Sequence, residues 1–253
     1  MSDYSIHISA AIVLFNQDQV TLQKTINAVK ECDEIKKLYI VDNSRFDNSL
    51  NYKGIDKIEY RFNKKNLGFG RAHNLILDEI KNKFTHHLVL NPDVFFNPKD
   101  IATLVCELEK KDNVAMISPK AIYPSGKIQY TCRKNPTFRE LIFRRLKLNK
   151  SYIHQQEYRD FNLTKSFYPD FVHGFFMLFK TQDFIELQGF DERYFLYMED
   201  ADICRKIYVN KKKVLYFPEV EVIHEHQKGS AKSFRLLFYH FSSAMKYFKK
   251  WKN

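Results

Sequence analysis

The chain has 253 residues, of which 44% are hydrophobic and 28% charged, an ordinary composition for a globular protein. This length accommodates one large α/β domain or two small ones. A formal net charge of +11 favours polyanionic partners such as nucleic acid, anionic lipid or phosphorylated substrates, and composition alone does not choose among them.

The chain shows no targeting segment and no motif built from cysteines. No apolar run approaches the ~20 residues of a membrane span, and the polar start at residues 1–5 does not resemble a secretory signal. The cysteines are too scattered for zinc-site or redox-motif spacing; they are Cys32, Cys106, Cys132 and Cys204. We therefore expect reduced thiols in a cytoplasmic protein.

The first hundred residues alternate predicted strands and helices. Short apolar runs predict strands at residues 6–15, 38–41, 58–62 and 87–90. Apolar residues at helical spacing predict a helix that starts between Asp18 and Thr21, either of which can cap it, and a second helix through residues 75–80. This alternation favours a parallel, nucleotide-binding-like sheet.

Polar residues follow two of these predicted strands. Asp42 comes directly after the second, and Asn91-Pro92-Asp93 comes after the fourth. Because proline ends strand pairing, Asp93 stands where a buried strand ends, the edge at which open α/β sheets bind ligands. A carboxylate there suits a hard cation that bridges phosphate oxygens. The same tripeptide is also common turn chemistry, so both interpretations stay open.

The turn at residues 66–70 contains Gly68 and Gly70 and leads into a predicted helix. Glycines allow a tight turn, and a turn that opens a helix can present backbone amides to phosphate. The full dinucleotide fingerprint is absent, so a plain turn is an equal interpretation.

The pattern changes in the second half of the chain. The expected elements are a helix at 101–108, a strand at 114–118, a hairpin at 122–130, a basic amphipathic segment at 138–148, a strand at 171–179, helices at 181–187 and around 203–207, and strand-like runs at 214–217 and 220–223 split by Pro218.

Three acids, Glu199, Asp200 and Asp202, follow four large apolar residues at positions 195–198. Acids at a helix start are favoured by the helix dipole, so capping accounts for them. An apolar wall beside a carboxylate also raises its proton affinity, and we place a catalytic role above capping for this reason.

Two features near the C-terminus have two interpretations each. His224 and His226 end a predicted strand and point to one face of it, as metal ligands or by coincidence. Residues 234–248 keep an apolar stripe at helical spacing with basic residues away from it. Such a basic amphipathic helix lies in a membrane interface or packs on the domain body.

Together these motifs resemble the family-2 glycosyltransferases of the GT-A fold, and most of all their bacterial rhamnosyltransferase branch. The matching segments cover residues from about 6 to 230 in the family's order: 41–44, 66–70 with Asn74, 90–93, 173–177, 189–191, 199–202 and 223–224. The resemblance implies an α/β GT-A fold, in which a Rossmann-like mixed sheet is flanked by helices. It implies a domain at 1–230, with a donor half to about residue 120 and an acceptor half at 121–230, followed by an amphipathic helix at 231–253.

The resemblance also implies roles on the donor side. Asp42 is expected to contact the nucleotide base or ribose. The other residues expected to bind the donor are Asn16, Asn66, Gly68, Phe69, Asn74 and Asn91. Asn91 occupies the first position of the family's Asp-x-Asp metal motif, where a neutral amide oxygen binds a divalent ion less strongly than a carboxylate.

The remaining implied roles concern the metal, the base and the acceptor. Asp93 and His224 are expected to hold Mg²⁺ or Mn²⁺, with His226 as the alternative histidine. Asp200 matches the catalytic base, with Glu199 as the alternative. The residues expected to face the acceptor are Arg133, His173 and Gly174.

The implied activity is an inverting, metal-dependent hexosyl transfer. The enzyme is expected to move rhamnose from dTDP-rhamnose, or alternatively a sugar from a UDP- or GDP-linked donor. The acceptor is expected to be a hydroxyl of a growing, lipid-linked bacterial surface polysaccharide such as lipopolysaccharide. The expected location is the inner face of the cytoplasmic membrane, as a peripheral protein held through the C-terminal helix.

Other classes explain less of the sequence. A sugar-phosphate nucleotidyltransferase is expected to carry a glycine-rich basic loop after its first strand, where this chain has Asn16-Gln17-Asp18-Gln19. A nucleic-acid-binding protein explains the charge but not the acids at strand ends, so we expect no nucleic acid partner. A membrane-surface interaction protein explains the tail but not the core.

Overall fold

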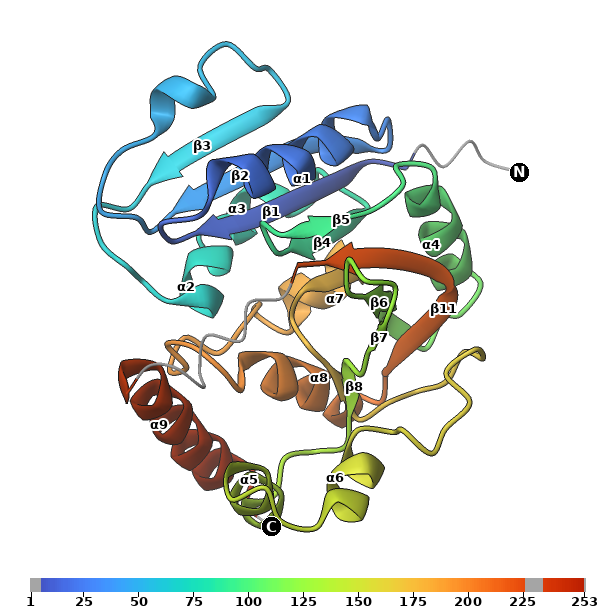
Figure 1. Cartoon of the computed structure of the whole chain (residues 1–253). Coiled ribbons are helices and arrows are strands. Elements are labelled where there is room, and N and C mark those ends of the chain that lie inside the picture. The colour runs from blue at the N-terminus through green and yellow to red at the C-terminus, as the bar shows by residue number, and fades with distance from the viewer. Residues whose placement is uncertain (1–5, 226–233, 253) are drawn as a thin grey trace.

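The computed structural model describes residues 6–225 and 234–252 of the chain (Figure 1). Its strands are β1 (Ile8–Leu14), β2 (Ile35–Asp42), β3 (Ile58–Phe62), β4 (His86–Leu90), β5 (Val94–Phe95), β6 (Val114–Ile122), β7 (Ile128–Gln129), β8 (Cys132–Arg133), β9 (Phe171–Val172), β10 (Phe176–Lys180) and β11 (Lys213–His224). Its helices are α1 (Gln19–Glu31), α2 (Phe69–Asn74), α3 (Leu77–Ile80), α4 (Asp100–Glu109), α5 (Phe138–Arg145), α6 (Lys150–Gln156), α7 (Thr181–Glu186), α8 (Glu199–Val209) and α9 (Phe234–Lys250), with a 3₁₀ turn at Ser49–Asn51.

One mixed sheet organises the molecule, in the strand order β3-β2-β1-β4-β10-β6-β11-β5, with β7 paired to β6. The pairs β1–β2, β1–β4 and β2–β3 are parallel, which confirms the predicted parallel start. β10 runs antiparallel between β4 and β6, and β11 returns parallel to β6. The carboxyl ends of β1, β2, β4 and β11 therefore meet the start of β10 at one edge.

Side chains alternate between the two faces of this sheet, and helices cover both. Ala10, Ile12 and Leu14 of β1 join a core with the apolar residues of α1 and α4, whereas Ala11 joins a second core with α2, α3, α7 and α8. The two-residue period of a strand produces this division. Figure 1 shows α5, α6 and α9 gathered at the end of the molecule away from β3.

Several predicted elements form where the sequence places them. Asp18 caps α1, its Oδ2 accepting a hydrogen bond of 2.8 Å from the backbone N–H of Thr21. The hairpin with the Pro-Ser-Gly turn forms as an antiparallel pair in which Ile122 faces Ile128. All four cysteines are free thiols.

Three predicted elements are divided differently in the structure than in the sequence-based prediction. In place of one helix through residues 75–80, the structure has two short helices, α2 ending at Asn74 and α3 beginning at Leu77. The strand expected at 171–179 is divided, because β9 pairs with β8 whereas β10 pairs with β4 and β6. In contrast, β11 runs through Pro218, and the missing N–H is accommodated by a register irregularity between Phe217 and Glu221.

The C-terminal helix α9 packs on the body through a face centred on Ser243, Ala244 and Tyr247, all buried. The Ser243 hydroxyl donates a hydrogen bond of 2.8 Å to the carbonyl of Leu196. Four residues of the apolar stripe remain exposed, namely Phe234, Phe238, Phe241 and Met245. The stripe itself is therefore not the main contact with the body. Within the described residues, every helix is too short or too polar to cross a bilayer.

Candidate active site

Asp93 and His224 come together where β5 pairs with the end of β11. In this antiparallel pair His224 faces Val94, and the carbonyl of Asp93 accepts a hydrogen bond of 3.0 Å from the N–H of Glu225. Nε2 of His224 consequently lies 3.4 Å from Oδ1 of Asp93. Two residues far apart in the sequence thus present a carboxylate and an imidazole to one point. The alternative histidine, His226, lies outside the described residues.

The surroundings of His224 fix its orientation. Gln129 of β7 donates from Nε2 to the carbonyl of His224 at 2.6 Å, which turns its Oε1 toward Nδ1 of the imidazole at 3.0 Å. Because an amide oxygen only accepts, Nδ1 carries a proton, and Nε2 is the nitrogen that faces Asp93. The ring also stacks on Phe175 with centroids 5.1 Å apart.

This pair fits a divalent cation. Oδ1 of Asp93 is buried and accepts no hydrogen bond from the described residues, and Nε2 of the His224 imidazole lies beside it. A histidine whose other nitrogen is held by an amide is a usual metal-ligand arrangement. No group of three or more His, Cys, Asp or Glu side chains suited to a metal occurs among the described residues. Two protein ligands suit a hard cation that a diphosphate completes.

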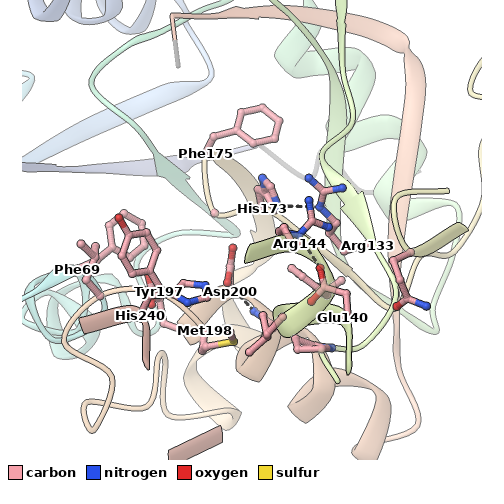
Figure 2. Close-up of a pocket in the computed structure, with 18 of the residues that line it drawn as sticks. Phe69, Arg133, Glu140, Arg144, His173, Phe175, Tyr197, Met198, Asp200 and His240 are labelled. Carbon is pink, nitrogen blue, oxygen red and sulfur yellow. Dashed lines mark hydrogen bonds and ion pairs between the residues drawn. The ribbon is translucent and has the colours of Figure 1, made fainter. Parts of the chain in front are cut away.

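Asp200 lies at the start of α8 and lines a cavity of about 380 Å³. Figure 2 shows it between Phe69, Tyr197 and His240 on one side and His173, Arg144 and Arg133 on the other. Burial raises the pKa of Asp200 to about 6, although the N–H groups of Ala201 and Gly174 favour the carboxylate. A carboxylate with a pKa near neutrality in a cavity is suited to general base catalysis.

Glu199 has a different environment. Its side chain is buried, and its Oε2 has no hydrogen-bond donor among the described residues. Burial, followed by the charge of Asp200, raises the pKa of Glu199 well above its ordinary value. These conditions favour its protonated form, so Asp200 has the better environment for a base.

The loop that leads into α8 has unusual backbone conformations. Tyr197 and Met198 have φ values of 70° and 69°, in the left-handed region that residues other than glycine seldom adopt. Two consecutive residues of this kind immediately before Glu199 and Asp200 indicate that the surrounding structure holds the loop in place. The sequence shows only bulky side chains here and does not reveal this conformation.

Arg133 and His173 line the cavity as a bonded pair. Nε of Arg133 donates to Nε2 of His173 at 3.2 Å, and its guanidinium forms an ion pair of 2.6 Å with buried Glu157. Glu157 also pairs with Arg144 at 2.6 Å, and Arg144 pairs with Glu140 at 2.6 Å. The sequence did not single out Arg144 or the two glutamates. Glu140 and Arg144 belong to the basic amphipathic segment predicted at 138–148, and their pairing with Glu157 depends on tertiary contacts.

The residues predicted to bind the donor divide into two groups. Phe69 and Asn91 line the cavity, together with the predicted Arg133, His173, Gly174, Glu199, Asp200 and His224. The other predicted residues lie outside its wall: Asn16, Asp42, Asn66, Gly68, Asn74 and Asp93. The roles assigned to all of these residues remain predictions.

Asp42 organises the loop that follows β2. It is fully buried, and its carboxylate accepts hydrogen bonds from Ser44 N–H at 2.7 Å, Asn48 Nδ2 at 3.0 Å and Tyr60 OH at 2.8 Å. The hydroxyl of Ser44 in turn accepts from the backbone of Asn16, which is exposed and has a φ of 51°. Asp42 therefore holds the loop after β2 in place through buried hydrogen bonds.

The 66–70 turn and Asn74 hold the loop before α8. Oδ1 of Asn66 accepts from Gly68 N–H at 2.8 Å, and Phe69 N–H donates to the carbonyl of Phe195 at 3.0 Å. The amide of Asn74 bonds both the N–H and the carbonyl of Phe190. These contacts position the segment that carries Asp200, in addition to any contact with a donor.

The fold and the site define a glycosyltransferase of the GT-A class. A solved structure, GalNAc-T7 with UDP, GalNAc and Mn²⁺, has a similar fold with a TM-score of 0.65, at 18% identity over 88% of this chain and 44% of that one. The chain belongs to glycosyl transferase family 2, whose model matches residues 9–182. This membership decides against the nucleotidyltransferase alternative and confirms the GT-A fold and the enzyme class that the sequence predicts.

Two related enzymes indicate the branch of the family. The rhamnosyltransferase WbbL of Escherichia coli (strain K12) is 26% identical over 93% of this chain and 90% of that enzyme. An N-acetylglucosaminyl-diphospho-decaprenol L-rhamnosyltransferase of Mycobacterium tuberculosis is 25% identical over 70% of this chain and 62% of its own length. The resemblance to the rhamnosyltransferase branch is thus confirmed.

Proposed function

We propose that this enzyme transfers rhamnose from dTDP-rhamnose to a sugar hydroxyl of a diphosphate-linked lipid acceptor during synthesis of a surface polysaccharide. The names of the two rhamnosyltransferase relatives support the sugar, and the mycobacterial relative supports the lipid-linked acceptor. Such an acceptor sits in a membrane, so we propose that the enzyme works as a peripheral protein at the inner face of the cytoplasmic membrane.

One observation carries this proposal: a single cavity is lined by Asp200 and by His224, whose imidazole faces Asp93. Asp200 and His224 thus line one space, and Asp93 lies 3.4 Å from the imidazole. Transfer of a glycosyl group needs a proton acceptor for the attacking hydroxyl and a counter-charge for the departing diphosphate.

In the proposed reaction, Asp200 accepts the proton of the acceptor hydroxyl as its oxygen attacks the anomeric carbon of the donor. A new C–O bond forms on the face opposite the bond to phosphate, which breaks with inversion, and the nucleotide diphosphate leaves. Arg133 and His173 orient the acceptor, and Phe69 excludes water from one side of the cavity.

Asp93 and His224 would hold Mg²⁺ or Mn²⁺, assisted by the amide oxygen of Asn91. The cation, when bound, supplies positive charge against the departing diphosphate. Gln129 and Phe175 keep His224 in the orientation that this role needs.

The base assignment is tested by comparing Asp200→Asn with Glu199→Gln. The first variant should lose roughly 10²–10⁴-fold in transfer rate, the usual contribution of a general base, while it retains donor affinity. The second preserves the neutral shape of a protonated glutamate and should keep most of the rate. Transfer rates and donor dissociation constants measured on both proteins distinguish the two residues. A reversed order of the two losses would assign the base to Glu199.

The donor and metal assignments are tested by thermal unfolding with dTDP-, UDP- and GDP-sugars, with and without Mn²⁺ or Mg²⁺. A ligand at a hundredfold excess over its dissociation constant stabilises the folded state by roughly 2.7 kcal/mol. We expect metal-dependent stabilisation by dTDP-rhamnose that Asp93→Ala abolishes and Asn91→Asp strengthens, because the latter adds a carboxylate ligand.

Stabilisation by a UDP- or GDP-sugar alone would overturn the proposed donor and keep the enzyme class. Equal metal dependence in the unaltered protein and in Asp93→Ala would remove Asp93 from the metal site. If no nucleotide sugar stabilised the protein, the proposed donor-binding site would be contradicted.

A further inference from the structure

A second cavity, of about 580 Å³, lies between α5 and α9. Its walls are largely apolar, and side chains that form them are exposed to an unusual degree: Ile142 is 52%, Phe241 64% and Met245 45% exposed. Phe138 of α5 stacks on Phe248 of α9 with ring centroids 3.8 Å apart and holds the two helices together. A concentrated apolar surface of this kind marks an interaction site on a folded protein.

The charged groups among the described residues that line this groove are all cations, namely Arg144, Arg145 and Lys147. Arg144 forms ion pairs with Glu140 and Glu157 through Nε and Nη1, whereas its Nη2 is buried and has no hydrogen-bond partner among the described residues. An apolar wall with cations at its border is complementary to an anionic group attached to a long hydrocarbon chain.

The groove adjoins the catalytic cavity. Leu141, Arg144 and His240 line both spaces. Arg144 therefore lies between the cavity that Asp200 lines and the apolar walls of α5 and α9. Figure 2 shows Arg144 beside Arg133 and Glu140 in the wall of the catalytic cavity.

We propose that the groove between α5 and α9 binds the first isoprenoid units of the lipid-linked acceptor, with the diphosphate beside Arg144 and the acceptor sugar beside Asp200. The proposal rests on the function proposed above and adds the location of the lipid. In such an acceptor the sugar is followed by the diphosphate and then by the hydrocarbon chain. The protein presents matching groups in the same order: the carboxylate of Asp200, the guanidinium of Arg144 and the apolar walls of the groove.

The shape of this site favours a substrate chain over the surface of a bilayer. A face that only rests on lipid headgroups needs neither a concave form nor a wall shared with the catalytic cavity. This groove has both. Helix α9 contacts α5 through Phe248 and leaves Phe241 and Met245 facing the space between the two helices, and Leu141, Arg144 and His240 line this space and the catalytic cavity.

The test uses two acceptors in detergent solution: N-acetylglucosaminyl-diphospho-decaprenol, and its analogue with a short, soluble alkyl chain. The double variant Ile142→Ser/Met245→Ser removes apolar surface from both walls of the groove. Val209→Ser is the matched control, because this residue is 64% exposed on α8 and lies outside both cavities.

We expect the double variant to raise the KM for the decaprenyl acceptor by about tenfold, because contacts with several CH₂ groups are lost. Its kcat, its KM for the donor and its KM for the short-chain acceptor should stay unchanged. The Val209→Ser control should match the unaltered protein with both acceptors.

Three results would overturn the proposal. An equal rise in KM for both acceptors would indicate general disturbance of the fold, and an unchanged KM for both would remove the groove from acceptor binding. If the double variant kept its kinetics in detergent but no longer bound anionic lipid vesicles in the absence of acceptor, the groove would be a membrane-docking surface. An unaltered protein that uses neither acceptor would instead contradict the proposed function itself.

The diphosphate position has its own test. Arg144→Gln should raise the KM for the short-chain diphosphate acceptor by about tenfold and leave the KM for a neutral alkyl glycoside of the same sugar unchanged. An equal rise for the glycoside would show that Arg144 acts only through the Glu140 and Glu157 ion pairs, and would remove it from phosphate binding.

Discussion

Three acids within four positions of α8 have three different environments. Asp202 is fully buried and accepts hydrogen bonds from Lys250 at 2.8 Å and from Trp251 at 2.7 Å, which attaches the C-terminal helix to α8. Glu199 is buried without a donor, and Asp200 faces the cavity. Because successive residues of a helix are rotated by about 100°, neighbouring acids in the sequence meet different surroundings.

The raised pKa of Asp200 predicts the pH dependence of transfer. A general base acts in its unprotonated form, and burial raises the pKa of Asp200 to about 6. The rate at saturating substrates should therefore be level above about pH 7 and fall toward a tenfold loss per pH unit below about pH 6. Donor binding measured at the same pH values separates this loss from titration of the metal ligands. A rate that is constant between about pH 5 and 7 would contradict the assignment.

At the scale of elements, the position of Asp200 depends on a chain of loop contacts that starts far away in the sequence. Asn43 at the end of β2 donates to the carbonyl of Gly68 at 3.0 Å, and the next residue, Phe69, binds the carbonyl of Phe195. The polar residue that follows β2 thus supports the loop before α8. Its function as a support is visible only in the structure.

Gly68→Ala should disturb this support more than Gly126→Ala. Both glycines have positive φ values, 86° and 78°, so alanine is strained at both positions. Gly68 also has a ψ of 179°, a combination that is essentially restricted to glycine. A Cβ at Gly68 moreover meets the carbonyl oxygen of Phe195 at 2.2 Å, whereas a Cβ at Gly126 meets open space. We expect Gly68→Ala to lower the free energy of unfolding by about 1–3 kcal/mol more than the control, the usual cost of overpacking.

Urea unfolding of both glycine variants and their transfer rates provide the measurement. The activity of Gly68→Ala should fall as well, because the displaced loop carries Asp200. Equal midpoints and equal rates for the two variants would show that the Phe195 contact contributes nothing to the site.

At the scale of the whole molecule, the C-terminal helix is part of the body. Tyr247 is fully buried in the core that α8 shares with the sheet, while Phe238 on the same helix is 67% exposed. We expect Tyr247→Ala to destabilise the protein by about 3–5 kcal/mol, as for other large aromatic residues removed from a core. Phe238→Ala should change the stability by less than about 0.5 kcal/mol. Thermal unfolding compares the two, and similar losses would show that α9 is not docked through Tyr247.

The sequence by itself determined the local elements and the positions of the acids along them. Alternating apolar runs and caps such as Asp18 predicted most strands and helices, because these patterns depend on neighbours a few residues away. Asp93 was singled out because it follows a buried strand, and Asp200 was one of three acids that follow an apolar wall at a helix start. The family resemblance added their expected roles.

Tertiary structure alone decided which of these residues meet. Asp93 reaches His224 only through the pairing of β5 with β11, and Gln129 holds the imidazole from a third segment. The split of residues 171–179 into two sheets, the packing face of α9 and the groove against α5 likewise depend on partners distant in the sequence. Strand pairing and side-chain packing join positions that no local pattern links. The catalytic cavity and the groove beside it therefore form only when the chain has folded.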